Sequence, residues 1–169
     1  MKRFSALSAI AAASLCLGAS SLRADEAPTD PSWRKAADNH IFAQTLVNDT
    51  MAANPDLVVI GLHAVAPGAK DETMIATNLD RVGKKDDDDD VAVATERKTI
   101  LAPNLKDSSR FEVQVPLKDS SGAIVGAIGL VFKYHAGDDE VALHVKALAI
   151  RDNIAKQVSG LADLFKPTS

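Results

Sequence analysis

Cysteine is nearly absent from this sequence. The 169 residues contain one cysteine, Cys16, and it lies inside an apolar N-terminal segment. A chain with no second cysteine cannot form an internal disulfide, so the stability of its fold must come from a buried core. The 145 residues that follow residue 24 suffice for one domain with a single core.

Apolar runs of membrane-spanning length are also absent. The apolar segment 4–17 follows the basic residues Lys2 and Arg3 and precedes small residues up to Ser21 and Ala24. This pattern is typical of a secretory signal peptide, and the segment is shorter and richer in alanine and serine than a transmembrane helix. We therefore expect a periplasmic or secreted protein. A segment that is retained as a membrane anchor is the alternative.

Positive charge is in short supply. The chain has 19 Lys and Arg against 23 Asp and Glu, which gives a formal net charge of −4. Loss of residues 1–24 would remove Lys2, Arg3 and Arg23 and leave a net charge of −7. Because phosphate backbones are bound by clustered Lys and Arg, this composition argues against a nucleic acid as partner.

Familiar catalytic and cofactor motifs are missing as well. The four histidines have neither HExxH nor CxxCH spacing, and the chain has no GxSxG elbow and no glycine-rich phosphate loop. We therefore expect no enzymatic activity, no metal site and no cofactor. Carboxylates such as Glu96 and Asp80 leave acid–base chemistry open, since one sequence gives no pairing geometry.

What the sequence does contain is an ordered series of helix and strand patterns. Asp30, followed by a proline, starts a segment whose apolar residues recur every three or four positions until Asn54, which predicts a helix over 31–53. Two β-branched runs, at 56–65 and 73–77, predict a β-hairpin with a longer loop.

The strongest strand signal lies in the second half of the chain. Apolar and polar side chains alternate over 110–118, an Asp-Ser-Ser-Gly turn follows, and 123–134 is apolar on both faces. The second of these strands should be central in a sheet, with Gly126 and Gly129 leaving room for close packing. Beyond it, apolar steps of three and four predict a long amphipathic helix over 138–165.

Five consecutive aspartates lie within the stretch KKDDDDDVAVATERK at 84–98. We predict that Asp87, Asp88 or Asp89 caps a helix that follows, because carboxylates stabilise the positive N-terminal end of a helix dipole. A calcium loop instead spaces its carboxylates and includes a glycine for the turn. Side chains of contiguous aspartates diverge, so a cation site is the less favoured alternative.

This order of elements resembles the single-Cache, PAS-like extracytoplasmic sensor domains. The leading helix, the strand LVVIGLHAV, the segment DRVGKK and above all the hairpin VPLKDSSGAIVGAIGLVFKY carry the resemblance, which covers about 31–135. It implies an α+β fold with a twisted antiparallel sheet of four to five strands, long terminal helices and a helical mid-chain connection. It also implies a small-molecule pocket between the sheet and the middle helices.

The chain departs from that family in two respects. Receptors of the family hold the domain between transmembrane segments, whereas the last helix here is amphipathic. No amino-acid-recognition signature can be carried over either.

Four residues are candidate ligand contacts. His63 lies on a strand expected to line the sheet, Arg97 and Arg110 could hold a carboxylate through a bidentate guanidinium, and Tyr134 ends the last strand. Simpler explanations stand beside these. His63 would be a hydrogen-bonded sheet histidine, Arg110 would pair with Glu112 or the aspartates, and Tyr134 would lie on the surface at the strand end.

The sequence as a whole predicts one sensory domain. The expected divisions are a signal peptide (1–24), a polar leader (25–30), a single domain (31–165) and a tail (166–169). We expect it to bind a small ligand, for which an anion is one candidate, and to pass the ligand state through its terminal helices to a partner, for which a membrane-bound signalling protein is one candidate. The same helices could also pack against a second copy in a homodimer, although a monomer could bury their apolar faces on the sheet. The alternative is a ligand-free interaction module of the same fold with a filled core.

Overall fold

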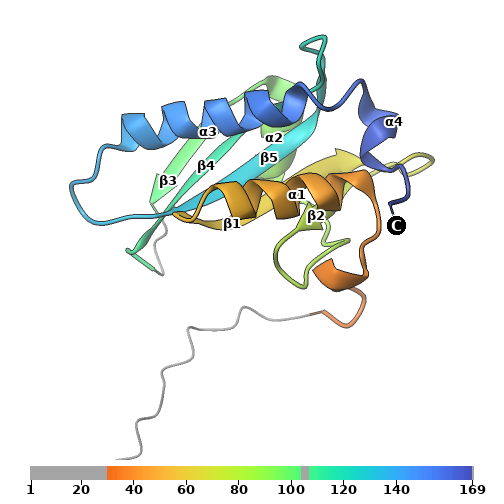
Figure 1. Cartoon of the computed structure of the whole chain (residues 1–169), viewed down its shortest axis with the longest axis horizontal. Coiled ribbons are helices and arrows are strands. Elements are labelled where there is room, and N and C mark those ends of the chain that lie inside the picture. Colours follow the sequence, from red (N-terminus) through yellow and green to blue (C-terminus); the bar gives the residue numbers. More distant parts are fainter. Residues whose placement is uncertain (1–29, 104–106, 169) are drawn as a thin grey trace, which may run out of the picture.

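The computed structural model describes residues 30–103 and 107–168 (Figure 1). The expected signal peptide, the leader before Asp30 and the last residue of the tail lie outside the described residues. In chain order the elements are η1 (Ala36–Asp38), α1 (Phe42–Ala53), β1 (Leu57–Val65), β2 (Glu72–Thr77), α2 (Asp88–Glu96), β3 (Ile100–Pro103), β4 (Arg110–Lys118), β5 (Ile124–Lys133), α3 (Glu140–Ala155) and α4 (Leu161–Leu164).

The five strands form one antiparallel sheet in the order β2-β1-β5-β4-β3. This confirms the predicted α+β class and the central position of β5. The predicted β4–β5 turn is closed by Asp119, whose side chain accepts hydrogen bonds from the backbone N–H groups of Ser121 (2.9 Å) and Ala123 (3.0 Å). Gly122 has a φ of 87° in that turn, a conformation that favours glycine.

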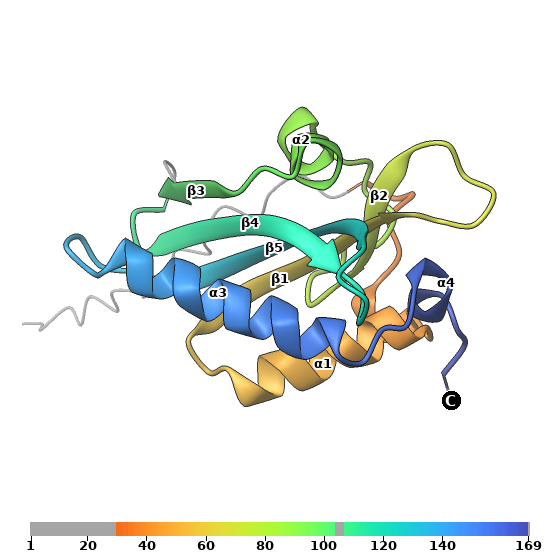
Figure 2. The ribbon, with the colours of Figure 1, turned by 90° about the horizontal axis from the view of Figure 1, so that it is seen from above.

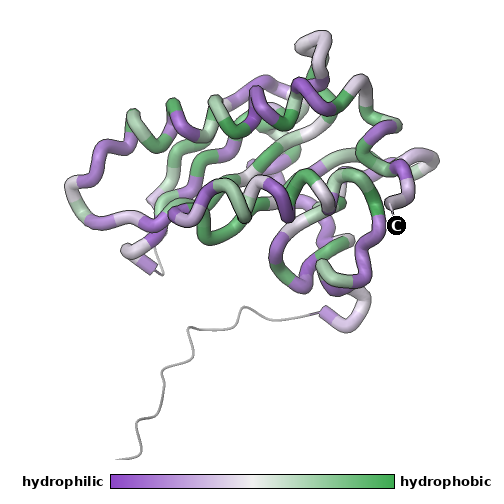
Figure 3. The backbone as a smooth tube through the Cα atoms, viewed as in Figure 1, coloured by the Kyte–Doolittle hydropathy of each residue, from purple (hydrophilic) through white to green (hydrophobic). Residues whose placement is uncertain are grey.

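The helices cover the two faces of the sheet unequally. Figure 2 shows α1 and α3 on one face and α2 on the other. The α1/α3 face holds the apolar core, where Phe111, Phe132, Leu62 and Leu130 are fully buried. Each such side chain contributes about 1.5–3 kcal/mol of burial free energy. Figure 3 shows apolar stretches along the strands and within these helices.

A close approach between β1 and β5 explains one of the two glycines in the central strand. A Cβ atom at Gly126 would lie 1.9 Å from the carbonyl oxygen of His63, so no other residue fits there. At Gly129 a Cβ would meet nothing closer than 3.5 Å, which is an ordinary contact. The predicted need for close packing is therefore confirmed at Gly126 alone.

The predicted helix over 31–53 is wrong at its start and right at its end. Helix α1 begins at Phe42, because the preceding residues bond to distant parts of the chain. Arg34 pairs through its backbone with Val82 (N···O 2.8 and 3.1 Å), and the side chain of Asn39 donates to the carbonyl of Ile75 (2.9 Å). These tertiary bonds outweigh the helical spacing of the apolar residues.

The predicted helix over 138–165 is likewise shorter than expected. Helix α3 ends at Ala155, and the chain turns before the one-turn helix α4. In that turn the backbone carbonyl of Val158 accepts a hydrogen bond from Ser120 of the β4–β5 loop (2.7 Å), which holds the apolar side chain of Val158 in the core. Strand β3 lies where the sequence predicts no strand. None of the described helices has the length and apolarity needed to cross a membrane.

Candidate functional site

The four candidate ligand contacts do not form one site. Arg110 forms an ion pair with Asp107 (Nε···Oδ2 2.8 Å). The predicted pairing of Arg110 with Glu112 or with the aspartate run is therefore wrong. Tyr134 donates a hydrogen bond from its hydroxyl to Glu140 (2.9 Å) and packs its ring on Phe111, on the α1/α3 side of the sheet.

Arg97 lies at the C-terminal end of α2, where it adopts a left-handed conformation with a φ of 60°. Together with Lys118 and Arg151 it lines a surface cleft of about 310 Å³ at the closed end of the β4–β5 hairpin. Arg151 is buried, and its guanidinium donates to Asp152 (2.6 Å) and to the carbonyl of Pro116 (3.4 Å).

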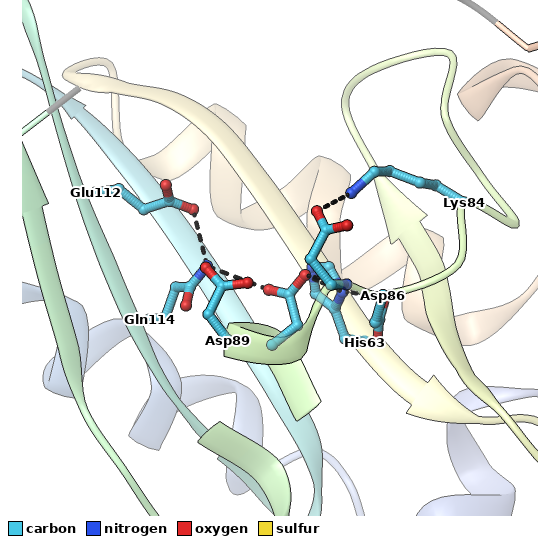
Figure 4. A network of polar contacts seen from close by, with 8 residues as sticks. His63, Lys84, Asp86, Asp89, Glu112 and Gln114 are labelled. Carbon is cyan, nitrogen blue, oxygen red and sulfur yellow. Dashed lines mark hydrogen bonds and ion pairs between the residues drawn. The ribbon is translucent and has the colours of Figure 1, made fainter. Parts of the chain in front are cut away.

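His63 is the candidate that the structure places in a polar cluster. Its side chain projects from β1 toward the α2 side of the sheet and is almost completely buried. The Nδ1 atom lies 2.7 Å from Oδ1 of Asp86 (Figure 4) and 3.8 Å from Oδ2 of Asp90. The simpler explanation, a hydrogen-bonded sheet histidine, is thus confirmed, but its partners are carboxylates.

Backbone hydrogen bonds to β2 bring Asp86 to this position. Met74 donates to the carbonyl of Lys84 (2.9 Å), Gly83 donates to the carbonyl of Met74 (2.8 Å), and Asp86 donates to the carbonyl of Glu72 (3.3 Å). The segment before α2 therefore runs along the edge strand and delivers the carboxylate of Asp86 to the buried imidazole.

The aspartate run performs two separate tasks in the first turn of α2. Asp87 is the N-cap and forms a capping box with Asp90, which confirms the predicted helix cap. Asp90 itself turns inward, where its Oδ1 accepts a hydrogen bond from Gln114 of β4 (3.1 Å). Gln114 also donates to Glu112 (3.3 Å).

We call this group of side chains the acidic cluster. It comprises His63 from β1, Glu72 from β2, Asp86 from the loop, Asp90 from α2, and Glu112 and Gln114 from β4. Of these residues, the sequence patterns predict only His63 as a site residue, since the others come from four separate segments. Glu112 and Gln114 of β4 could have indicated a polar face of the sheet, because alternate residues of a strand lie on the same face.

Burial and mutual repulsion shift the ionisation of the cluster. Burial, with the neighbouring charge of Asp86, raises the pKa of Glu72 to about 7. Burial also raises the pKa values of Asp90 and Glu112. For His63, burial lowers the pKa, but the hydrogen bond and charge of Asp86 outweigh it and the pKa rises. The pKa values of all four groups are raised because the cluster holds carboxyl groups away from water and close to one another.

Positive charge near the cluster is scarce among the described residues. Lys84 pairs with the helix cap Asp87 (2.7 Å), and Lys85 pairs with the exposed Asp71 (3.4 Å). Meanwhile Oδ2 of Asp86 and Oε1 of Gln114 are buried without a hydrogen-bond partner in the described part of the chain. Buried oxygens of this kind cost free energy unless something compensates them.

Comparisons with known proteins show similarity in the solved structures alone. No family model and no curated protein matches the chain. The Agobacterium tumefaciens repressor BlcR is 11% identical with a TM-score of 0.48, covering 71% of this chain and 68% of that one. A GAF domain is 14% identical with a TM-score of 0.49, covering 73% and 78%. The C-terminal domain of the E. coli transcriptional regulator KdgR is 13% identical with a TM-score of 0.44, covering 69% and 96%.

Likeness at this level concerns the arrangement of helices and strands only. The single-Cache resemblance stays a prediction.

Proposed function

We propose that this chain is a secreted sensory domain that binds a small, positively charged ligand at the acidic cluster, between α2 and the sheet. The observation that carries the proposal is the buried Oδ2 of Asp86, which has no hydrogen-bond partner within 30–103 and 107–168, beside a second buried carboxylate. Binding rather than catalysis is assigned to the site, and a partner would read the ligand state.

The charge of the cluster supports a cationic ligand. Glu72, Asp86, Asp90 and Glu112 supply four carboxyl groups, and His63 is the one basic side chain in their midst among the described residues. Burying carboxylates that lack full compensation is costly, and a bound cation offsets that cost. The ligand proposed here therefore differs in sign from the anion considered on sequence grounds.

The position of the cluster fits a sensory role. Helix α2 is nine residues long and holds Asp90 against the sheet through Gln114 of β4. A ligand that bridges Asp90 to Asp86 and His63 would tie α2 more tightly to β1. Such a ligand stabilises one placement of the helix, which is the differential interaction that a sensor needs.

A second candidate function places an anion in the cleft lined by Arg97, Lys118 and Arg151. Three cationic side chains around a cleft of about 310 Å³ favour a small carboxylate or phosphate. In this candidate function Arg97 contacts the ligand and the ligand is an anion, as the sequence suggested. The cleft is separate from the acidic cluster.

A thermal-shift screen of the purified protein tests both candidates. Alkylamines, amino acids, divalent cations, carboxylates and phosphate are each added in excess. A ligand at a hundred times its dissociation constant should stabilise the protein by about 2.7 kcal/mol, enough to raise the midpoint by several degrees.

Each outcome has a definite meaning. A shift with cations or amines that is lost in Asp90→Asn supports the acidic cluster. A shift with anions that is lost in Arg97→Ala supports the cleft. No shift with any class would favour the ligand-free interaction module.

A further inference from the structure

We propose that the ligand of the acidic cluster is a divalent transition-metal ion held by His63, Asp86 and Asp90. This inference rests on the proposed function, since it names the ligand of the same site. It departs from the sequence-based expectation of no metal site, because the ligands are one histidine and two aspartates from three segments rather than the aspartate run alone.

The geometry of the three side chains suits one ion. A ring nitrogen of His63 and one carboxylate oxygen from each aspartate all lie within 4.8 Å of one another. Nδ1 of His63 is 2.7 Å from Asp86 and 3.8 Å from Asp90, and Figure 4 shows His63 and Asp86 side by side. Two ligand atoms about 2.0–2.2 Å from one ion lie about 3 Å or more apart, so the side chains need to move only slightly. The proton shared by Nδ1 of His63 and Oδ1 of Asp86 must be released to solvent when the ion binds.

A second, independent observation points to a ligand. The side chain of Asp86 is 1% exposed, its carboxylate is directed at His63, and its Oδ2 has no hydrogen-bond partner among the described residues. An exposed aspartate would satisfy that oxygen with water. This buried oxygen belongs to the carboxylate that bonds His63 through Oδ1, and it has unused lone pairs that a metal ion could take.

The neighbouring residues orient the ligands as outer-shell residues do in metal sites. Gln114 donates to Oδ1 of Asp90, which leaves Oδ2 as the atom that faces His63. The same Oδ2 accepts a long hydrogen bond from the backbone N–H of Asp87 (3.4 Å). Partners of this kind fix a carboxylate in one orientation and raise the affinity of the site.

The ligand set favours a transition metal over calcium or magnesium. Calcium takes six to eight oxygen ligands and magnesium keeps several waters, so neither gains from an imidazole. Imidazole with carboxylates suits Zn²⁺, Ni²⁺ and related ions.

A second group, formed by Asp87, Asp89 and Asp90, also brings carboxylate oxygens together, but two of its members are exposed. Asp87 there already caps α2 and pairs with Lys84. We therefore assign the ion to the buried set.

Isothermal titration of the purified protein with Zn²⁺ and Ni²⁺ tests the inference. We expect one ion per chain, with Ca²⁺ and Mg²⁺ binding much more weakly. His63→Gln and Asp90→Asn should each lower the affinity about tenfold or more. His135→Ala is the matched control, since His135 is an exposed histidine 3.5 Å from the carboxylate of Asp138 and should not affect binding at the cluster.

A second measurement does not depend on the folding of these variants. In the wild-type protein labelled with ¹⁵N-histidine, Zn²⁺ should move the ring signals of a single histidine. That histidine is His63 if the shift persists when His40, His135 and His144 are each replaced by Gln.

Several results would overturn the inference. Absence of one-to-one binding would do so, as would loss of binding in His135→Ala alone, which is the mark of an adventitious surface ion. Equal binding of Ca²⁺ that His63→Gln leaves unchanged would exclude the imidazole as a ligand. If metal ions fail but amines raise the midpoint in an Asp90-dependent way, the proposed function stands and the metal does not. If neither metal ions nor amines bind, both the proposed function and the metal site are wrong.

Discussion

At the scale of single residues, the acidic cluster holds more negative charge than its one histidine can balance. At Glu112, burial raises the pKa of the carboxyl group, and the charges of Asp90 and Asp89 add to the rise. The Glu112→Gln substitution keeps the oxygen that accepts from Gln114 and removes the charge. We expect this variant to be more stable in metal-free buffer by on the order of 1 kcal/mol.

Urea denaturation of both proteins measures that difference. Glu96→Gln is the matched control, since it removes a carboxylate from an exposed pair with Lys98 and should change stability by less than about 0.5 kcal/mol. A destabilised Glu112→Gln protein would mean that the charge of Glu112 is compensated.

Gly61 offers a test of the position of the imidazole. A Cβ at this position would lie 2.8 Å from Nε2 of His63, so an alanine must displace the ring while the backbone stays unstrained. We expect Gly61→Ala to fold and to bind Zn²⁺ about tenfold more weakly. The matched control is Gly129→Ala. Gly129 pairs with Gly61 across the β1–β5 ladder, and a Cβ atom there would meet nothing closer than 3.5 Å. Unchanged affinity in Gly61→Ala with a normal melting curve would contradict the placement of His63 as a ligand.

At the scale of elements, the aspartate run shows how adjacent residues of one type differ in role. Asp87 caps α2, whereas Asp88 is exposed in the first turn. Asp87→Ala should therefore cost about 1 kcal/mol of stability. Asp88→Ala should cost less than about 0.5 kcal/mol. Chemical denaturation of the two variants decides this, and equal losses would mean that the cap contributes nothing.

The turn at α4 carries a pH dependence of known sign. Hydrogen bonds from Lys166 and Ser159 lower the pKa of Asp163 from its usual 3.8 to about 2. A carboxyl group whose pKa is lower in the folded state stabilises the fold above its unfolded pKa and loses that effect as the pH falls through the folded value. The difference in melting temperature between wild type and Asp163→Asn should therefore be full at pH 5 and shrink toward pH 2. A difference that grows as the pH falls would contradict it.

The elements also show what sequence patterns can and cannot predict here. Strands β1, β2, β4 and β5 and the Asp87 cap follow from local alternation and turn residues, so they were predictable. The start of α1 was not, because the bonds of Arg34 and Asn39 to distant residues displaced a good helical pattern. The early end of α3 has a similar cause.

At the scale of the whole molecule, the strand order creates the acidic cluster. Strands β1 and β4 flank β5, which brings His63 and Gln114 to the same face although 50 positions separate them in the sequence. Helix α2 then covers that face and supplies Asp90 (Figure 2). Sequence patterns assign residues to faces, but they do not give the order of strands, so the cluster could not be assembled from the sequence.

Hydrogen exchange with and without saturating Zn²⁺ tests the central claim, that α2 and the sheet hold a cation between them. Local opening of a short helix depends on the contacts that hold it, so a bound ion should slow exchange of the amides of 86–96. Exchange in α3, on the opposite face, should not change. Slower exchange confined to α3 or to the cleft at Arg97, or no change anywhere, would contradict binding at the acidic cluster.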